Sequence, residues 1–166
     1  MADEIEYRFL LAALPDFSGI KPIPITQGYL STDPAKTVRI RRIGEKAKIT
    51  VKGLKNGATA PEFEYDIPVE DAEIMLAMCG EENTLDKDRF CYTAEDGHVW
   101  EVDRFKGRLE GLVIAELEVP SLKTAFAKPH WMNGVEITTD MRFANSALVK
   151  TQREVMMSNI VSVLNP

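Results

Sequence analysis

The sequence predicts a single α+β domain built around an antiparallel sheet. Charged and apolar residues alternate along several short segments, which is the period of a strand with two different faces. Tight-turn sequences separate these segments, and a helical pattern follows Pro68. The 166 residues contain no internal repeat, low-complexity tract or linker, so we expect one domain spanning residues 1–166.

The strands carry most of this prediction. Residues 4–9 read EIEYRF, with charged side chains at every second position and apolar or aromatic ones between them. A short strand is expected at 27–30. Similar alternation predicts further strands at 37–42, 47–53, 62–68, 86–90, 100–105 and 114–119. Turn signals that suit the reversal of antiparallel pairs lie at 32–34, 55–57, 96–97 and 106–107.

Three helical regions are expected. Pro68, acidic residues in the first turn and Gly80 as a stop predict a helix over 69–80. A second helix is expected at 121–127, and a broken helical region at 142–164, where apolar residues recur. Residues 15–26 contain Pro15, Pro22 and Pro24 and are expected to form an irregular connection.

One face of the predicted strands collects charge, and on most strands the charges have one sign. The groups of residues that share this face are Glu4, Glu6 and Arg8; Thr37, Arg39 and Arg41; Lys48, Thr50 and Lys52; Glu62, Glu64 and Asp66; Lys87 and Arg89; Glu101 and Asp103; Glu116 and Glu118. For any single strand, a solvent-exposed sheet face explains the pattern well. Like charges two residues apart repel, so their recurrence favours metal-binding acids on one side and phosphate-binding bases on the other. Periodicity leaves open whether this face is exposed or enclosed.

Composition excludes several classes of protein. The formal net charge of −6 argues against non-specific nucleic-acid binding, which needs a basic face. No apolar run approaches the ~20 residues that cross a bilayer, so we expect no membrane partner. The chain opens with charged residues, and its two cysteines lack CxxC spacing, so a reducing cytoplasm is the expected location. The sequence leaves open whether the chain forms a homodimer.

The order of these segments resembles that of the CYTH superfamily, the triphosphate tunnel metalloenzymes. EIEYRF is similar to the family's ExExK signature, and QGYL, TVRIRR, ITVKG, EFEYDIP, DKDRF, WEVDRFKG, GLVIAELEV and PHWMNGVEITTDMRFANSAL follow in the family's order. The resemblance implies an eight-stranded antiparallel β-barrel whose charged faces line a tunnel, with helices packed outside. It also implies a requirement for Mg²⁺ or Mn²⁺ and a small-molecule triphosphate as substrate.

Position by position, the resemblance implies two sets of site residues. The expected metal ligands are Glu4, Glu6, Asp103, Glu116 and Glu118. The expected triphosphate-binding residues are Arg8, Arg39, Arg41, Lys52, Lys87 and Arg89. Glu62, Glu64 and Glu101 are expected to line the tunnel as further acids. For Glu62 and Glu64 two roles stay open, a second metal site and ion-pair partners. Arg8 stands where the family signature has lysine; it keeps a charge for phosphate binding but is too basic to accept a proton.

The leading functional hypothesis is metal-dependent hydrolysis of a triphosphate, with inorganic triphosphate first and thiamine or nucleoside triphosphates next. Water attacks the terminal phosphorus, and Lys52 or Lys87 accepts a proton if neighbouring cations lower its pKa. Two alternatives stay open: a class IV-type adenylate cyclase, and a non-catalytic polyphosphate- or nucleotide-binding module.

Several reactive residue types are expected to lie outside the site. His98 is assigned to a loop or strand edge and His130 to a surface or helix-adjacent position. Cys79 and Cys91 are assigned to buried packing positions. Tyr29 has two interpretations of equal weight, one at an end of the tunnel and one in the core.

Overall fold

A computed structural model describes residues 2–166. The strands are β1 (Ala2–Leu11), β2 (Ile23–Ser31), β3 (Lys36–Ile43), β4 (Lys46–Gly53), β5 (Thr59–Ile67), β6 (Thr84–Thr93), β7 (Val99–Phe105), β8 (Val113–Glu118) and the short β9 (Val135–Glu136). The helices are α1 (Val69–Cys79), α2 (Asn145–Leu148) and α3 (Arg153–Leu164). A 3₁₀ turn at Met141–Phe143 precedes α2.

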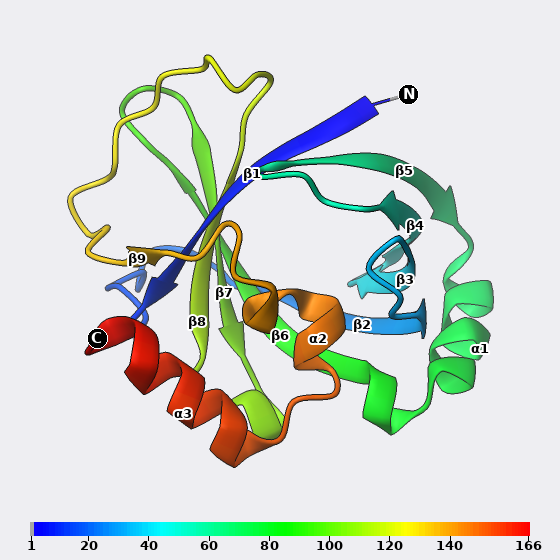
Figure 1. The fold of residues 1–166 in the computed structure, drawn as a ribbon. Helices are drawn as coiled ribbons and strands as arrows, with labels where there is room; N and C mark the ends of the chain where they lie inside the picture. Colours follow the sequence, from blue (N-terminus) through cyan, green and yellow to red (C-terminus); the bar gives the residue numbers. More distant parts are fainter. Residues whose placement is uncertain (1) are drawn as a thin grey trace.

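The strands close into a barrel. Neighbouring strands follow the order β5-β4-β3-β2-β6-β7-β8-β1, and β1 also pairs with β5, so the eight strands form a ring. β1 achieves this closure by pairing with β5 through its first half, as at Ile5↔Thr59, and with β8 through its second half, as at Glu6↔Glu118. Every strand pair is antiparallel. Figure 1 shows the ring, and the expected eight-stranded antiparallel barrel is confirmed.

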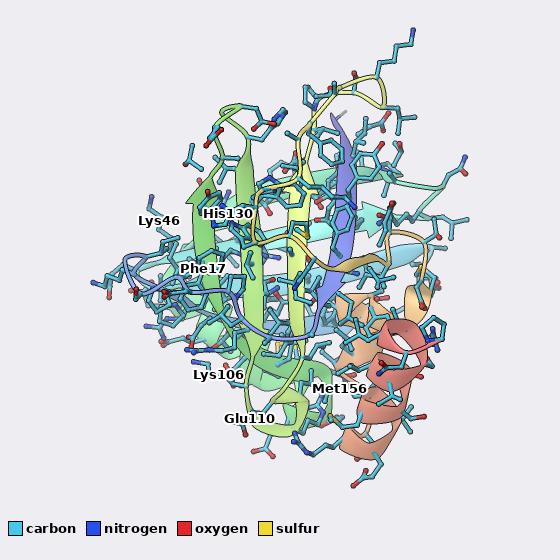
Figure 2. All side chains as sticks on the ribbon, turned by 90° about the vertical axis from the view of Figure 1, so that its left-hand side faces the viewer. Phe17, Lys46, Lys106, Glu110, His130 and Met156 are labelled. Atoms are coloured by element: carbon cyan, nitrogen blue, oxygen red, sulfur yellow. The ribbon has the colours of Figure 1, made fainter. Side chains whose placement is uncertain are left out.

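Much of the apolar packing lies outside the ring. On β1, Phe9 and Leu11 alternate with Arg8 and pack against the connecting segments, together with Phe17 and Trp100. Figure 2 shows Phe17 and His130 on segments that cross the outer face of β6, β7 and β8. His130 is exposed there, as expected for a residue outside the site.

One end of the barrel interior is apolar as well. Leu10, Phe105 and Ile114 continue the inward-facing positions of β1, β7 and β8 beyond their charged residues, and they pack with Phe143 and Leu148 from the C-terminal segment. These side chains are each at most 1% exposed. The interior therefore divides into a charged part and an apolar plug to which α2 contributes.

Two of the three predicted helical regions are confirmed. Helix α1 packs outside β2, β3 and β4, and the C-terminal region is broken into α2 and α3, which lie apart in Figure 1. The helix expected at 121–127 is wrong: residues 120–134 form an irregular crossing. The Ser121 hydroxyl accepts from the Lys123 amide at 3.3 Å, a local turn that competes with helix initiation.

Two smaller expectations need correction. The irregular connection ends earlier than predicted, at Pro22, because β2 begins at Ile23 and includes Pro24. Pro24 is tolerated because the pairing of β2 with β3 starts only at Ile25, so one edge is unpaired at the proline. Cys79 is buried as expected, but Cys91 is exposed. No helix in residues 2–166 combines the length and apolarity needed to cross a bilayer.

Candidate active site

The charged strand faces surround a cavity of about 200 Å³ inside the barrel. Its walls come from β1, β3, β4, β5, β6, β7 and β8, with one residue from α2. The lining residues are Glu4, Glu6, Arg39, Arg41, Lys52, Glu62, Glu64, Arg89, Val99, Glu101, Glu116, Glu118 and Asn145. Most of the site residues expected from the sequence therefore meet at one cavity.

Strand register explains how these residues meet. Alternation turns every second side chain of each strand inward, and ring closure makes that face an interior. Glu6 lies opposite Glu118, so two acids of different strands become neighbours. Lys52 lies opposite Glu62, so a base and an acid do the same. A one-residue slip of any strand would turn its charges outward.

The lining of the cavity is acidic overall. Seven glutamates face four cations, so its formal charge at neutral pH is three negative. The cations come from β3, β4 and β6, whereas the glutamates come from β1, β5, β7 and β8. This separation places a basic wall and an acidic wall around one space.

Arg41 is the least neutralised cation of the cavity. Among residues 2–166 it forms no ion pair, and its buried Nε has no hydrogen-bond partner. The guanidinium reaches the cavity but is otherwise enclosed by the barrel, and burial together with Arg39 and Arg89 lowers its pKa to about 10. A buried cation without a carboxylate partner is the environment that an anionic ligand stabilises.

The other cations are held by carboxylates. Lys52 forms an ion pair with Glu4 and lies 3.5 Å from Glu62. Burial lowers its pKa, but the charges of Glu6 and Glu4 outweigh burial and raise the pKa of Lys52. Arg39 lies 3.6 Å from Glu64. Lys52 is thus kept protonated, which suits it to bind phosphate and not to accept a proton.

The glutamates of the opposite wall influence one another. Burial raises the pKa of Glu6, and the nearby charges of Glu116 and Glu4 raise it further. Burial and the charge of Glu4 likewise raise the pKa of Glu118. Glu116 differs, because Arg8 at 3.1 Å opposes the effect of burial and lowers its pKa. Carboxylates in this repulsive arrangement favour a bound cation.

No three acidic, cysteine or histidine side chains in the described chain converge closely enough to hold one ion between them. Instead, Glu4 contacts Lys52, and Glu116 contacts Arg8 and Arg89. Glu6 and Glu118 both have a raised pKa. Glu118 forms no ion pair among residues 2–166, and Glu6 lies 3.5 Å from Arg8. A divalent cation shared with Glu4 or Glu116 would therefore replace the ammonium or guanidinium partners of those two glutamates.

Lys87 and Asp103 lie behind the wall of the cavity. Both side chains are fully buried, with Lys87 Nζ donating to Asp103 Oδ2 at 2.5 Å. Arg89 donates to both Asp103 oxygens, at 2.7 and 2.8 Å, so this aspartate orients Arg89 toward the cavity. Burial lowers the pKa of Lys87 to about 8, although Asp103 opposes that change. The expected roles of Lys87 in catalysis and Asp103 as a metal ligand stay predictions.

Arg8 links the site to the C-terminal segment. Its Nε donates to Glu116 at 3.1 Å, and its Nη1 donates to the Phe143 carbonyl at 2.9 Å. Its buried Nη2 has no hydrogen-bond partner among residues 2–166. Arg8 does not line the cavity of about 200 Å³ but lines a smaller, adjoining one.

Two polar residues near the site were not predicted from the sequence. Asn145 lines both cavities, and its buried Oδ1 lacks a hydrogen-bond partner within residues 2–166. Gln27 is fully buried and donates to the Tyr29 hydroxyl at 3.2 Å. Tyr29 combines the two interpretations, since it packs in the core and also lines the smaller cavity. Asn145 lies between Ala144 and Ser146 in MRFANSAL, where no local pattern distinguishes it from a surface asparagine.

Comparisons with known proteins agree on one group. No family model matches the chain. An inorganic triphosphatase from Acetivibrio thermocellus is 42% identical over 150 residues, which span 90% of this chain and 95% of that protein. An inorganic triphosphatase from Nitrosomonas europaea is 36% identical over 149 residues, which span 87% of this chain and 95% of that protein.

Solved structures share the barrel. The crystal structure of the inorganic triphosphatase NE1496 matches with a TM-score of 0.64 at 35% identity, over 91% of this chain and 97% of that one. A Hippeastrum protein described as having a dominant triphosphatase activity matches with a TM-score of 0.53 at 13% identity, over 73% of this chain and 80% of that one, which shows the fold alone. The chain belongs to the CYTH family of triphosphate tunnel enzymes, among relatives that are inorganic triphosphatases.

Proposed function

We propose that this protein is a divalent-metal-dependent inorganic triphosphatase that releases phosphate and diphosphate. The observation that carries the proposal is Arg41, a cation without an ion pair among residues 2–166 that faces seven glutamates across one cavity. A triphosphate supplies the anionic partner that Arg41 lacks, and a metal ion supplies a cationic partner for the glutamates. The family relationship supports the same substrate.

The phosphate-binding role belongs to Arg39, Arg41, Lys52 and Arg89. Their side chains project from β3, β4 and β6 toward the same space, so they contact successive phosphates of an extended chain. Arginine binds two phosphate oxygens at once, whereas Lys52 acts as a point charge. Asp103 positions Arg89 through two hydrogen bonds at 2.7 and 2.8 Å.

The metal-binding role belongs to Glu4, Glu6, Glu116 and Glu118. The fit to Mg²⁺ or Mn²⁺ rests on the donor set, which is made of carboxylate oxygens in an acidic cavity. A bound divalent ion would neutralise phosphate oxygens and favour attack by water at the terminal phosphorus. Glu62, Glu64 and Glu101 border the same cavity and fix the positions of Lys52, Arg39 and Arg89 through ion pairs.

Most of the rate enhancement is expected from positioning and charge neutralisation. Phosphoryl transfer needs little covalent help from the protein, and fixed charges stabilise the transferred group. Lys52 is held protonated and acts as a cation. Lys87 has a pKa of about 8, so it loses its proton more readily than Lys52 and suits a base better. Its place behind the cavity wall nevertheless favours a role in orienting Asp103.

The test is phosphate release from inorganic triphosphate, thiamine triphosphate and ATP, each with Mg²⁺, Mn²⁺ or a chelator. We expect turnover of inorganic triphosphate that stops on chelation. Glu6→Gln and Glu118→Gln should remove metal-dependent release, while the exposed Glu110→Gln should retain it. Cyclic AMP as the main product from ATP, or triphosphate binding without turnover under either metal, would overturn the proposal.

A further inference from the structure

A second, smaller cavity adjoins the candidate active site. It has a volume of about 90 Å³ near the ends of β2, β3 and β4, and residues from the segment 138–146 form one side of it. Four residues, Glu6, Arg39, Lys52 and Asn145, line both this side chamber and the larger cavity. The side chamber therefore shares part of its wall with the proposed triphosphate site.

The charge of the side chamber is opposite to that of the larger cavity. Its lining contains the four cations Arg8, Arg39, Lys52 and Lys55 but only two carboxylates, Glu6 and Asp140. Asp140 accepts hydrogen bonds from Arg142 at 2.6 and 2.9 Å. Three of the cations are also paired, Arg8 with Glu116, Arg39 with Glu64 and Lys52 with Glu4. The chamber thus carries a formal positive charge before any metal binds, whereas the larger cavity is acidic.

Lys55 contributes a cation that the larger cavity does not use. It forms no ion pair in the part of the chain that the structure describes, and its side chain is half-buried. Burial lowers the pKa of Lys55 even though the charge of Glu6 opposes this. Its loop is fixed to β1, because the Glu6 amide donates to the Ala58 carbonyl at 3.0 Å. The loop that carries Lys55 is therefore fixed to β1, although no carboxylate pairs with the Lys55 side chain in the described chain.

The remaining lining combines hydroxyl groups with the apolar side chains of Pro34, Met141 and Ala144. Tyr29, Thr37 and Ser146 contribute hydroxyl groups, which donate hydrogen bonds to phosphate oxygens. Arg8 lines the chamber and has a buried Nη2 without a hydrogen-bond partner in the described chain. At about 90 Å³ the chamber is less than half as large as the neighbouring cavity of about 200 Å³, which suits it to a single phosphate group.

We propose that the side chamber is a metal-independent subsite for one phosphate group, with Lys55 as the cation that determines its affinity. Two sources share this chemistry: the orthophosphate that hydrolysis releases, and the terminal phosphate of a bound triphosphate. The choice between these sources rests on the proposed function, but phosphate binding by the chamber does not.

The first experiment measures binding without turnover. Inorganic phosphate is titrated into the full-length protein by calorimetry in the presence of a chelator. We expect binding that Lys55→Gln weakens at least about tenfold, since a charge-assisted contact is lost. Lys55→Arg should bind nearly as well as the original protein. Lys46→Gln is the matched control, because Lys46 is an exposed lysine of β4 that lines neither cavity.

Absence of phosphate binding without metal would overturn the proposal, as would equal affinities of the original protein and Lys55→Gln. Thermal unfolding of each variant separates loss of the subsite from loss of the fold. If phosphate binds as expected but no triphosphate is hydrolysed, the subsite stands and the proposed function fails. If triphosphate is hydrolysed and Lys55→Gln changes no phosphate affinity, the proposed function stands and the subsite fails.

The second experiment identifies the source of the phosphate by steady-state kinetics on inorganic triphosphate with added orthophosphate. Competitive inhibition, with a higher KM in Lys55→Gln, supports occupation by the terminal phosphate of the substrate. Noncompetitive inhibition that weakens in Lys55→Gln, with KM unchanged, supports occupation by the released product. Orthophosphate inhibition that is identical in the original protein and Lys55→Gln contradicts both.

Discussion

Arg41 and Arg42 are neighbours in sequence, but their environments differ because they lie on opposite faces of β3. Arg41 faces the cavity without an ion pair among residues 2–166, whereas Arg42 faces outward and pairs with Glu73 of α1. Arg41 is repelled by Arg39 and Arg89, which contribute to its lowered pKa. The protein therefore retains an unfavourable arrangement of charge at the position where we propose that a phosphate binds.

Replacing Arg41 by methionine should separate function from stability. We expect kcat/KM for triphosphate to fall by at least about a hundredfold, because a bidentate phosphate contact disappears. The free energy of unfolding should rise by about 1 kcal/mol, because repulsion inside the barrel is relieved. Phosphate-release kinetics and urea denaturation measure the two effects. Arg42→Met is the control on the same strand, and equal losses of activity in both variants would contradict the assignment.

Asp103 is expected to matter first for stability. Asp103→Asn leaves the buried Lys87 and Arg89 without the carboxylate that both contact. Breaking a buried ion pair from one side costs about 3–5 kcal/mol. Urea denaturation should show this loss, and Asp88→Asn on the exposed side of β6 should show much less, since its partners Arg104 and Lys106 are about half exposed. A loss below about 1 kcal/mol for Asp103→Asn would contradict the network.

At the scale of elements, α1 depends on a close approach to β2. A Cβ atom at Gly28 would lie 2.9 Å from Cys79 Sγ and 3.1 Å from Leu76 Cδ2. Glycine at this position therefore lets the helix contact the barrel wall. The register of β2 then places the neighbouring Gln27 and Tyr29 on the inner face.

Gly28→Ala should destabilise the protein by about 1–3 kcal/mol, the usual cost of overpacking. Removing the nearest obstacle in the double variant Gly28→Ala/Cys79→Ala should restore part of that stability. Urea denaturation of both single variants and the double variant gives the coupling energy. Strict additivity of the two single effects would show that Cys79 does not limit the approach.

The elements also show where local patterns are sufficient. Alternation along EIEYRF and TVRIRR predicted β1 and β3, because a strand with two chemically different faces has a period of two. The segment 121–127 lacked an equivalent constraint, and Phe126 instead packs against Tyr7 and Trp100 on the barrel. Its conformation follows from tertiary packing, which a local sequence pattern does not predict.

At the scale of the whole molecule, the acidic cavity couples metal binding to pH. Glu6 and Glu118 have pKa values raised above 4.5, so the folded chain binds more protons at these groups than the unfolded chain. Their contribution to stability is present below the unfolded pKa and is lost as the pH rises through the folded pKa. Glu116, whose pKa is lowered, acts in the opposite direction, and its contribution is lost as the pH falls through its folded pKa.

Mg²⁺ should therefore raise the melting temperature more at about pH 7.5 than at about pH 5, because protons compete with the metal for Glu6 and Glu118. Differential scanning fluorimetry with Mg²⁺ or a chelator at both pH values measures this. The double variant Glu6→Gln/Glu118→Gln should lose most of the gain. A gain independent of both pH and these glutamates would place the metal elsewhere.

The sequence by itself determined the two-faced strands, the segregation of acids from bases and, through family resemblance, the closed barrel. These properties are local or follow the order of motifs along the chain. Only the tertiary structure decided which charged residues reach the cavity: Arg41 does, whereas Lys87 and Asp103, on equivalent strand positions, lie behind its wall. It also decided that Asn145 and Lys55 border the site, because Leu148 of α2 packs with Leu10 of β1 and the β4–β5 loop accepts a hydrogen bond from the Glu6 amide. Periodicity specifies a side chain's face, but its depth and neighbours depend on how the ring closes and what fills its end.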